Sequence, residues 1–87
     1  MPTQSFKEKV FRVVRGIRRG GVLTYQEVAR RAGNPRAARA VGAVLRTNFN
    51  PAIPCHRVVR SNGALGGYNR GVGRKRFLLA RERLSEL

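Results

Sequence analysis

Glycines and helix-capping residues divide the first half of the chain into short helices. The spacing Ser-x-x-Glu at residues 5–8 and Thr-x-x-Glu at residues 24–27 is that of a capping box, in which a hydroxyl and a carboxylate satisfy free N–H groups at a helix start. Apolar side chains then recur at helical spacing and predict one buried stripe, formed by Phe6, Val10, Val13, Val14 and Ile17. Gly20-Gly21 is predicted to end this first helix. The second helix extends from the second capping box through Ala32.

A third helix is predicted to begin directly after Gly33, because Asn34 is a favourable N-cap and Pro35 fits the first helical position. It runs to about Arg46, with its apolar residues inward: Val41, Val44 and Leu45. Two short helices joined at Gly33-Asn34 form a helix-turn-helix. The second of them begins with arginines separated by small residues: Arg36, Ala37, Ala38, Arg39, Ala40, Gly42 and Ala43. This pattern favours a helix that reads DNA; the alternative is that the alanines serve helix packing and the arginines face solvent.

The charge of the chain indicates nucleic acid as its partner. Nineteen Lys and Arg residues against four Glu and no Asp give a formal net charge of +15. A field of this strength usually serves to bind a phosphate backbone. A membrane surface would require basic residues opposite a broad apolar helix face or in a tail, whereas the arginines here are spread from Arg12 to Arg83.

The length of 87 residues indicates a single small domain, spanning 1–87, with a modest core. No apolar run reaches the length of a membrane span, and the N-terminus lacks the apolar core of a signal peptide. One cysteine cannot form an intramolecular disulfide. We therefore expect an intracellular protein, located in the cytoplasm or on the nucleoid.

The second half of the chain is less regular. An irregular segment is followed by a short extended piece at His56–Val59 and a turn at Ser61–Gly63. Residues 66–73 form a glycine-rich loop, and a last helix is predicted at Arg74–Leu84. The expected fold is mainly α: a winged-helix-like domain with a helix-turn-helix and a short extended or β segment.

The only cysteine and the only histidine of the chain are adjacent, within the sequence NPAIPCHRVV at residues 50–59. A lone cysteine is most often a small buried hydrophobe, and these two residues supply too few ligands for a structural zinc ion. We therefore expect no metal and no cofactor. A nucleophilic cysteine would need a base and a residue to orient that base. Because adjacent side chains of an extended chain point to opposite sides, a turn after Pro54 or a bridging water would have to connect His56 with Cys55.

Glu82 is the acid that could orient His56. The other three acids are explained by helix caps or by the C-terminal tail. Glu82 follows Leu78 and Leu79 by four and three residues, on the apolar stripe of the last helix. An inward acid is costly unless a core residue pairs with it, and His56 is a candidate partner. The alternative is that Glu82 turns outward to solvent.

Several motifs together resemble the DNA-binding and active-site domain of the O6-alkylguanine-DNA alkyltransferases. They occur in the family's order over about residues 6–86: Thr24-Tyr25-Gln26, Ala32-Gly33-Asn34-Pro35, Arg39-Ala40-Val41-Gly42, Pro54-Cys55-His56-Arg57-Val58, Gly66-Gly67-Tyr68 and Leu78-Leu79-Ala80-Arg81-Glu82. The resemblance implies direct repair of double-stranded DNA: a monomer flips O6-alkylguanine out of the duplex and transfers the alkyl group irreversibly to Cys55. Larger members carry an additional N-terminal domain, and the resemblance implies that residues 1–87 correspond to the DNA-binding and active-site domain without it.

The resemblance implies a role for each catalytic residue. His56 takes the proton of Cys55 through a water, and Glu82 orients His56. Tyr68 donates a hydrogen bond to the base. Asn48 braces the turn ahead of the cysteine; the loop from residue 48 to residue 54 looks one residue shorter than the common pattern, so Asn50 is an alternative brace.

The resemblance also assigns contacts to DNA and to the flipped base. It places the helix-turn-helix in the minor groove, whereas the residues alone would suggest the major groove. Tyr25 lies beside the phosphate that rotates, and Arg39 fills the space that the base leaves. Further DNA contacts are expected at Arg36, Ala37, Ala38, Gly42 and Arg46. The substrate pocket is expected at Val58, Gly66, Gly67, Asn69 and Arg70, with Arg70 narrowing the range of alkyl groups.

Two other functions remain open. Alkyltransferase-like proteins of similar size bind alkylated guanine and signal to other repair factors without transferring the group, and they replace the cysteine; Cys55 favours transfer. A plain helix-turn-helix regulator would leave Glu82 and Tyr68 unexplained.

Overall fold

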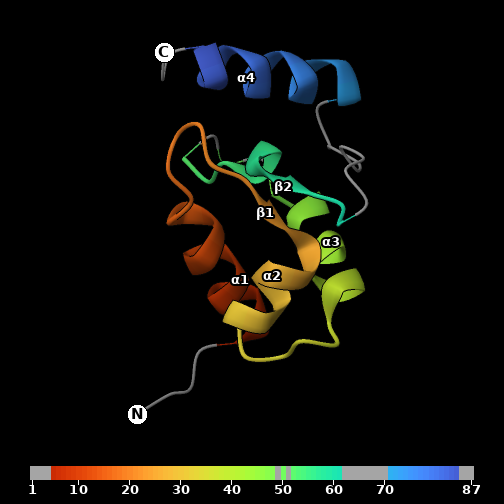
Figure 1. The fold of residues 1–87 in the computed structure, drawn as a ribbon. Helices are drawn as coiled ribbons and strands as arrows, with labels where there is room; N and C mark the ends of the chain where they lie inside the picture. Colours follow the sequence, from red (N-terminus) through yellow and green to blue (C-terminus); the bar gives the residue numbers. More distant parts are fainter. Residues whose placement is uncertain (1–4, 49, 51, 62–70, 85–87) are drawn as a thin grey trace.

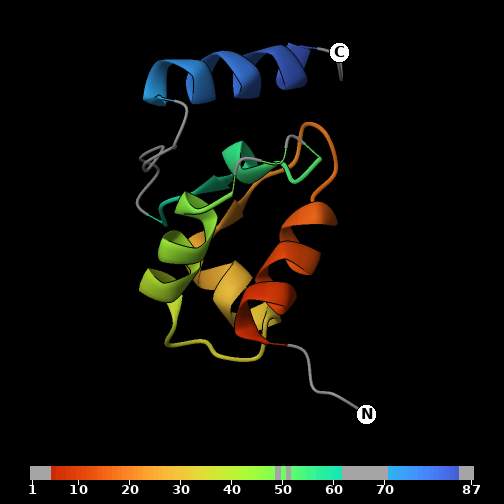
Figure 2. The ribbon, with the colours of Figure 1, turned by 180° about the vertical axis from the view of Figure 1, so that it is seen from behind.

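A computed structural model describes residues 5–48, 50, 52–61 and 71–84. The elements, in chain order, are α1 (Phe6–Arg15), β1 (Leu23–Thr24), α2 (Tyr25–Arg31), α3 (Ala38–Arg46), the 3-10 turn η1 (Cys55–Arg57), β2 (Val58–Val59) and α4 (Val72–Leu84). Helices α1, α2 and α3 form the body of the domain, and α4 lies across one end of it, above η1 and the two strands (Figure 1). The same arrangement is seen from behind in Figure 2. Among the described helices, none is both long and apolar enough to cross a membrane.

Both predicted capping sites start helices. Ser5 accepts a hydrogen bond from the Glu8 N–H at 3.2 Å. At α2 the capping box is complete, because Thr24 Oγ1 accepts from the Glu27 N–H at 3.0 Å while Glu27 Oε1 accepts from the Thr24 N–H at 3.1 Å. These bonds from Thr24 hold the pKa of Glu27 below its ordinary value. The sequence therefore located both helix starts correctly.

Helix α1 ends at Arg15, one turn before the Gly20-Gly21 pair that was predicted to stop it. Gly16, a poor helix former, is the C-cap, and its N–H bonds back to two carbonyls of the last turn. The glycine pair serves the next turn instead. Gly20 has a φ of +86°, a left-handed conformation that favours glycine, and the Gly21 N–H closes the turn on the Arg18 carbonyl at 2.9 Å.

Helix α3 begins at Ala38, three residues after the predicted first helical position at Pro35. The Asn34 side chain accepts from the Arg36 N–H at 3.3 Å, and its backbone carbonyl accepts from the Ala37 N–H at 3.1 Å. Asn34 therefore closes a local turn that competes with the first turn of a helix. Gly33 has a φ of +94° and begins this connection. The helix-turn-helix is present with a longer turn than expected.

The segment expected to be extended at His56–Val59 is extended only at its end. Residues Cys55–Arg57 form the 3-10 turn, in which the Arg57 N–H bonds to the Pro54 carbonyl at 3.0 Å. The two remaining residues pair in parallel with β1, in the register Leu23 with Val58 and Thr24 with Val59. Parallel strands need a long crossover, and α2 and α3 supply it.

The last helix starts at Val72, two residues before its predicted start, with a first bond from the Lys75 N–H to the Gly71 carbonyl at 3.2 Å. Most of the predicted turn at 61–63 and of the glycine-rich loop at 66–73 lies outside the described residues. The predicted mainly helical domain with a helix-turn-helix and a short β segment is confirmed.

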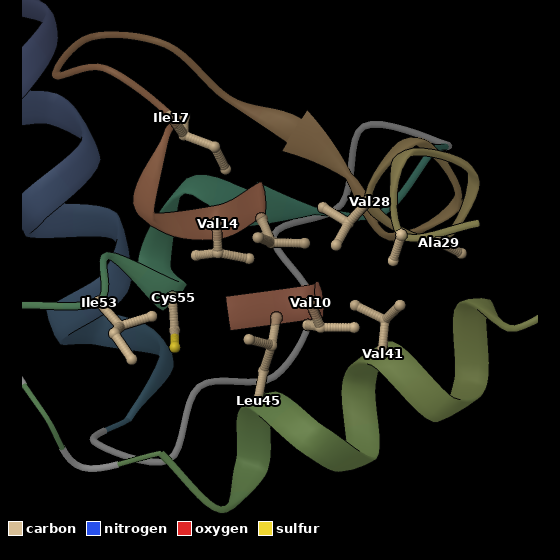
Figure 3. Packing of buried hydrophobic residues seen from close by; sticks show 11 residues of the cluster. Val10, Val14, Ile17, Val28, Ala29, Val41, Leu45, Ile53 and Cys55 are labelled. Carbon is tan, nitrogen blue, oxygen red and sulfur yellow. The ribbon is translucent and has the colours of Figure 1, made fainter. Parts of the chain in front are cut away.

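The core lies between α1, α2 and α3. The predicted stripe of α1 is buried at Val10, Val14 and Ile17 and partly buried at the other two positions. These residues pack against α2, α3 and the segment around the cysteine, through Val28, Ala29, Ala32, Val41, Leu45, Ile53, Cys55 and Val58. Cys55 lies beside Ile53 at one end of this cluster, and Val28 and Ala29 lie at the other (Figure 3). The core therefore holds the thiol at its edge.

Candidate active site and nucleic-acid interface

The sulfur of Cys55 is held by the side chain of Asn48. Cys55 is only 7% exposed, and the Nδ2 of Asn48 lies 2.8 Å from its Sγ. The same amide donates to the carbonyls of Ile53 at 3.4 Å and Asn50 at 3.3 Å, while its Oδ1 accepts from the Asn50 N–H at 3.0 Å. The Asn50 side chain accepts from the Ala52 N–H, on the exposed side of the segment. Of the two candidate braces, Asn48 is therefore the one that contacts the thiol.

The imidazole of His56 faces the carboxylate of Glu82, which α4 brings over the 3-10 turn. Their Nε2 and Oε2 atoms lie 3.0 Å apart, and both residues are buried. Arg57 binds the same carboxylate with two donors: Nε donates to Oε1 at 2.9 Å and Nη2 donates to Oε2 at 2.6 Å. Glu82 thus points inward, and the 3-10 turn directs two adjacent side chains to one acid.

The pKa of Glu82 is lowered to about 2. The hydrogen bonds from Arg57 are the main cause, and they outweigh burial, which acts in the opposite direction; the contact with His56 lowers the value further. The carboxylate is therefore ionised at every physiological pH. An ionised carboxylate accepts hydrogen bonds and donates none, so it favours the ring form of His56 that carries a hydrogen on Nε2 and leaves Nδ1 as the acceptor.

A fully buried lysine of α4 contacts the strand β2. Lys75 has no exposed surface, and its Nζ donates to the Val58 carbonyl at 2.6 Å and lies 5.7 Å from the centre of the Tyr25 ring. Burial is the main cause that lowers the pKa of Lys75 to about 8; the proximity of Cys55 raises it and that of Arg60 lowers it. A cation is therefore buried close to the thiol.

The arginines of the helix-turn-helix surround two adjoining hollows. One, of about 490 Å³, is lined by Tyr25, Ala38, Arg39, Gly42, Arg46 and Arg60. The other, of about 460 Å³, is lined by Tyr25, Gln26, Pro35, Arg36, Ala38, Arg60 and Ser61. All the predicted DNA contacts except Ala37 line one of the two; Ala37 packs, half-buried, against the core. The structure adds Arg60, which the sequence did not single out and which lines both.

Tyr25 lines both hollows and also lies near enough to Cys55 to be affected by its charge. It is half-buried at the start of α2, and burial raises the pKa of its hydroxyl. Cys55 raises that pKa as well, while Arg60 and Arg46 lower it. Gly42 of α3 lies against the same ring, because a Cβ built on it would be 3.9 Å from Tyr25 Cε1.

Of the remaining predicted site residues, only Val58 lies within the described part of the chain. Val58, expected in the substrate pocket, is fully buried in the core and contributes its carbonyl to Lys75. Tyr68, Gly66, Gly67, Asn69 and Arg70 lie outside the described residues.

Comparison with known proteins identifies the family. Residues 5–84 match the model of the 6-O-methylguanine DNA methyltransferase, DNA binding domain. The chain belongs to this family.

Three members or structural neighbours of the alkyltransferase family illustrate the match. The human methylated-DNA–protein-cysteine methyltransferase is 48% identical over 81 residues, covering 91% of this chain and 39% of the human protein. The Mycobacterium tuberculosis OGT, solved in complex with DNA, aligns at a TM-score of 0.88 with 38% identity, covering 95% of this chain and 52% of that one. Atl1 of S. pombe, solved with damaged DNA containing O6-carboxymethylguanine, aligns at 0.80 with 34% identity, covering 94% and 79%. The chain thus spans well under half of its human relative.

Two cationic residues of this alkyltransferase domain, the half-buried Arg57 and the buried Lys75, were missed from the sequence. Arg57 follows the Cys-His pair within an apolar run, and an extended strand would have directed it away from its neighbour His56. Lys75 precedes Leu78, Leu79 and Glu82 by three, four and seven residues, which places it on the inward stripe of α4. That spacing was a usable signal for Lys75, whereas Arg57 required knowledge of the 3-10 turn.

Proposed function

We propose that this domain repairs O6-alkylguanine in double-stranded DNA by transferring the alkyl group to Cys55. The observation that carries the proposal is the sulfur at 2.8 Å from the Asn48 amide, next to a histidine whose Nε2 lies 3.0 Å from a carboxylate oxygen. A donor at the sulfur stabilises negative charge there, and a thiolate is the nucleophilic form of cysteine. The family to which the domain belongs and the names of its relatives support this chemistry.

The step balances without a cofactor. His56 accepts the thiol proton on Nδ1 through a bridging water. The sulfur then attacks the alkyl carbon bound to guanine O6. A carbon–sulfur bond forms, the carbon–oxygen bond breaks with its electron pair leaving on the base, and a proton returns to guanine. The products are an S-alkyl cysteine and ordinary guanine. Because a thioether has no easy leaving route, we infer one turnover per molecule.

The DNA is proposed to lie against the face that carries the two hollows, with the helix-turn-helix in the minor groove. The domain is proposed to act as a monomer, on chromosomal DNA inside the cell. A base inside the stack is out of reach of a buried sulfur, so the nucleotide must flip, at a cost of about a few kcal/mol. Arg39 would fill the space left in the stack, and Tyr25 would contact the rotated phosphate. Tyr68 remains the proposed donor to the base, and Arg70 the residue that narrows the pocket.

The test is stoichiometric self-alkylation. The protein is incubated with a duplex containing O6-methylguanine, and its intact mass is measured with peptide mapping. We expect the mass to rise by one methylene, on Cys55, and the lesion to return as guanine. The matched control, Cys55→Ala, should bind the duplex without repairing it. A wild-type protein that binds the lesion and keeps its mass would contradict the proposal.

Lesion binding without transfer is the second candidate. It is favoured by the likeness to Atl1, of which this chain covers 79%. In that case wild type and Cys55→Ala would bind the lesion equally and leave it in place, so the same experiment separates the two functions.

A further inference from the structure

The half-buried guanidinium of Arg57 donates three hydrogen bonds. Two go to the two oxygens of Glu82. The third runs from Nη1 to the backbone carbonyl of Ile17 at 2.7 Å, in the segment that follows α1. The side chain therefore links the body of the domain to the carboxylate of α4, over a separation of 25 residues to Glu82 and 40 to Ile17.

This geometry fixes the direction of the carboxylate as well as its charge. A guanidinium fork matches a carboxylate in one plane, so the two bonds leave Glu82 little freedom to rotate. Arg57 Nε donates to Oε1, and Oε2 meets both Arg57 Nη2 and His56 Nε2. The position of the oxygen that meets the imidazole is therefore set by Arg57.

We propose that Arg57 is a positioning residue for the transfer reaction: it holds Glu82 so that His56 keeps its hydrogen on Nε2 and presents Nδ1 as the proton acceptor. The expected effect of Arg57 on the rate of alkyl transfer rests on the proposed function. Its expected effect on the His56 ring can be measured in the protein without DNA. The two adjacent residues thus have different roles. His56 exchanges the proton, and Arg57 acts on His56 through Glu82.

The first test reads the tautomer directly. The chain has a single histidine, so protein labelled with nitrogen-15 histidine gives one pair of ring-nitrogen signals. For wild type near neutral pH we expect the widely separated pair of a single tautomer with its hydrogen on Nε2. In Arg57→Gln the two signals should move toward each other as a second ring form becomes populated. Arg57→Lys, which keeps the charge and loses the fork, should fall between the two.

The second test is a double-mutant cycle on the rate of transfer, measured in a single turnover. We expect Arg57→Gln to slow transfer roughly tenfold, below the ~100- to 10,000-fold that proton transfer contributes. If Arg57 acts through Glu82, the loss in Arg57→Gln combined with Glu82→Gln should equal the loss in Glu82→Gln alone, because the two residues act as a unit. Arg83→Gln, an exposed arginine on α4, is the matched control and should leave the rate unchanged.

Each outcome decides the proposal. Multiplying losses in the double variant, or an unchanged histidine spectrum in folded Arg57→Gln, would overturn it. If neither Arg57→Gln nor Arg57→Lys folds, as judged by circular dichroism, Arg57 is a structural residue and the proposal also fails. Absence of any transfer by wild type would instead refute the proposed function, and the histidine spectra would still decide the role of Arg57.

Discussion

The polar cluster between η1 and α4 and the face formed by α2 and α3 use charge in opposite ways. In the cluster, Glu82 and Lys75 are buried, and their contacts with Arg57, His56 and the Val58 carbonyl span 2.6–3.0 Å. On the face, Arg36 and Arg39 are exposed beside open hollows. The first set of charges is arranged by contacts within the protein, whereas the second set faces open space and is the set that we propose to contact DNA.

The difference implies that stability and binding can be separated by mutation. Breaking a buried charge pair leaves the other charge without compensation, which destabilises strongly. Replacing an exposed arginine changes little within the protein, but it would remove one of the proposed phosphate contacts. The free energy of unfolding should therefore report on the buried charges, and the affinity for duplex DNA should report on the exposed arginines.

Glu82→Ala should have the largest effect on stability. It leaves the half-buried guanidinium of Arg57 and the buried ring of His56 without their anion, and we expect the free energy of unfolding to fall by about 3 kcal/mol, near the low end for buried charge pairs. Urea denaturation followed by circular dichroism measures this. Glu8→Ala, at an exposed cap, is the control and should lose far less. A Glu82→Ala protein as stable as the control would show that the cluster contributes nothing to the fold.

Acid should remove part of the same stabilisation from the wild type. The pKa of Glu82 is about 2 in the folded protein against an ordinary 4.5, so its contribution is complete above about pH 4.5 and is lost as the pH falls toward 2. We expect a loss of roughly 2–3 kcal/mol over this range. Glu27 titrates in the same direction. The measurement therefore compares wild type with Glu82→Gln, and parallel pH curves for the two would contradict the assignment.

Gly42→Ala should raise the stability of the protein and lower its affinity for duplex DNA. The added Cβ would lie in ordinary contact with Tyr25 at 3.9 Å, so it fits the free protein. Alanine in a helix interior is favoured over glycine by about 1 kcal/mol, and thermal melting should show this gain. Affinity for duplex should fall, because the methyl group occupies a hollow proposed to face DNA. An unchanged affinity would remove Gly42 from the interface.

Arg60→Gln should have the smallest effect on stability, within about 0.5 kcal/mol. Its effect should appear in the salt dependence of duplex binding, where one lost phosphate contact lowers the slope of log affinity against log salt by about 1. Arg83→Gln is the control for total charge. Equal slopes for the two variants would show that Arg60 contributes only to the overall field.

Local signals in the sequence predicted the parts of the fold that local interactions determine. The Thr24–Glu27 box starts α2 as written, and the stripe of α1 is buried where its spacing placed it. Helical spacing left two positions open for Glu82, and the structure shows the inward one. These features depend on contacts within a few residues.

The features that the sequence did not predict depend on competition or on distant partners. Asn34 is a good N-cap, yet its side chain closes a turn on Arg36 and delays α3. The cysteine lies in a 3-10 turn because Pro54 and Arg57 bond across it, and that turn decides where Arg57 points. The bond from Arg57 to Ile17 spans 40 residues, and no local pattern encodes such a contact.

The three contacts of the Asn48 amide also limit how the chain can vary in length. Its side chain bonds within a span of seven residues, to two carbonyls and to the sulfur at the end of the span. An insertion between Asn48 and Cys55 would lengthen a loop whose closing atoms are fixed, and it would displace the thiol from its donor. An insertion in the turn between α2 and α3 would break the bonds that close that turn at Asn34, but it would leave the thiol beside its donor. The segment before the cysteine therefore acts as a spacer of defined length, and insertions there should displace the thiol far more than insertions between α2 and α3.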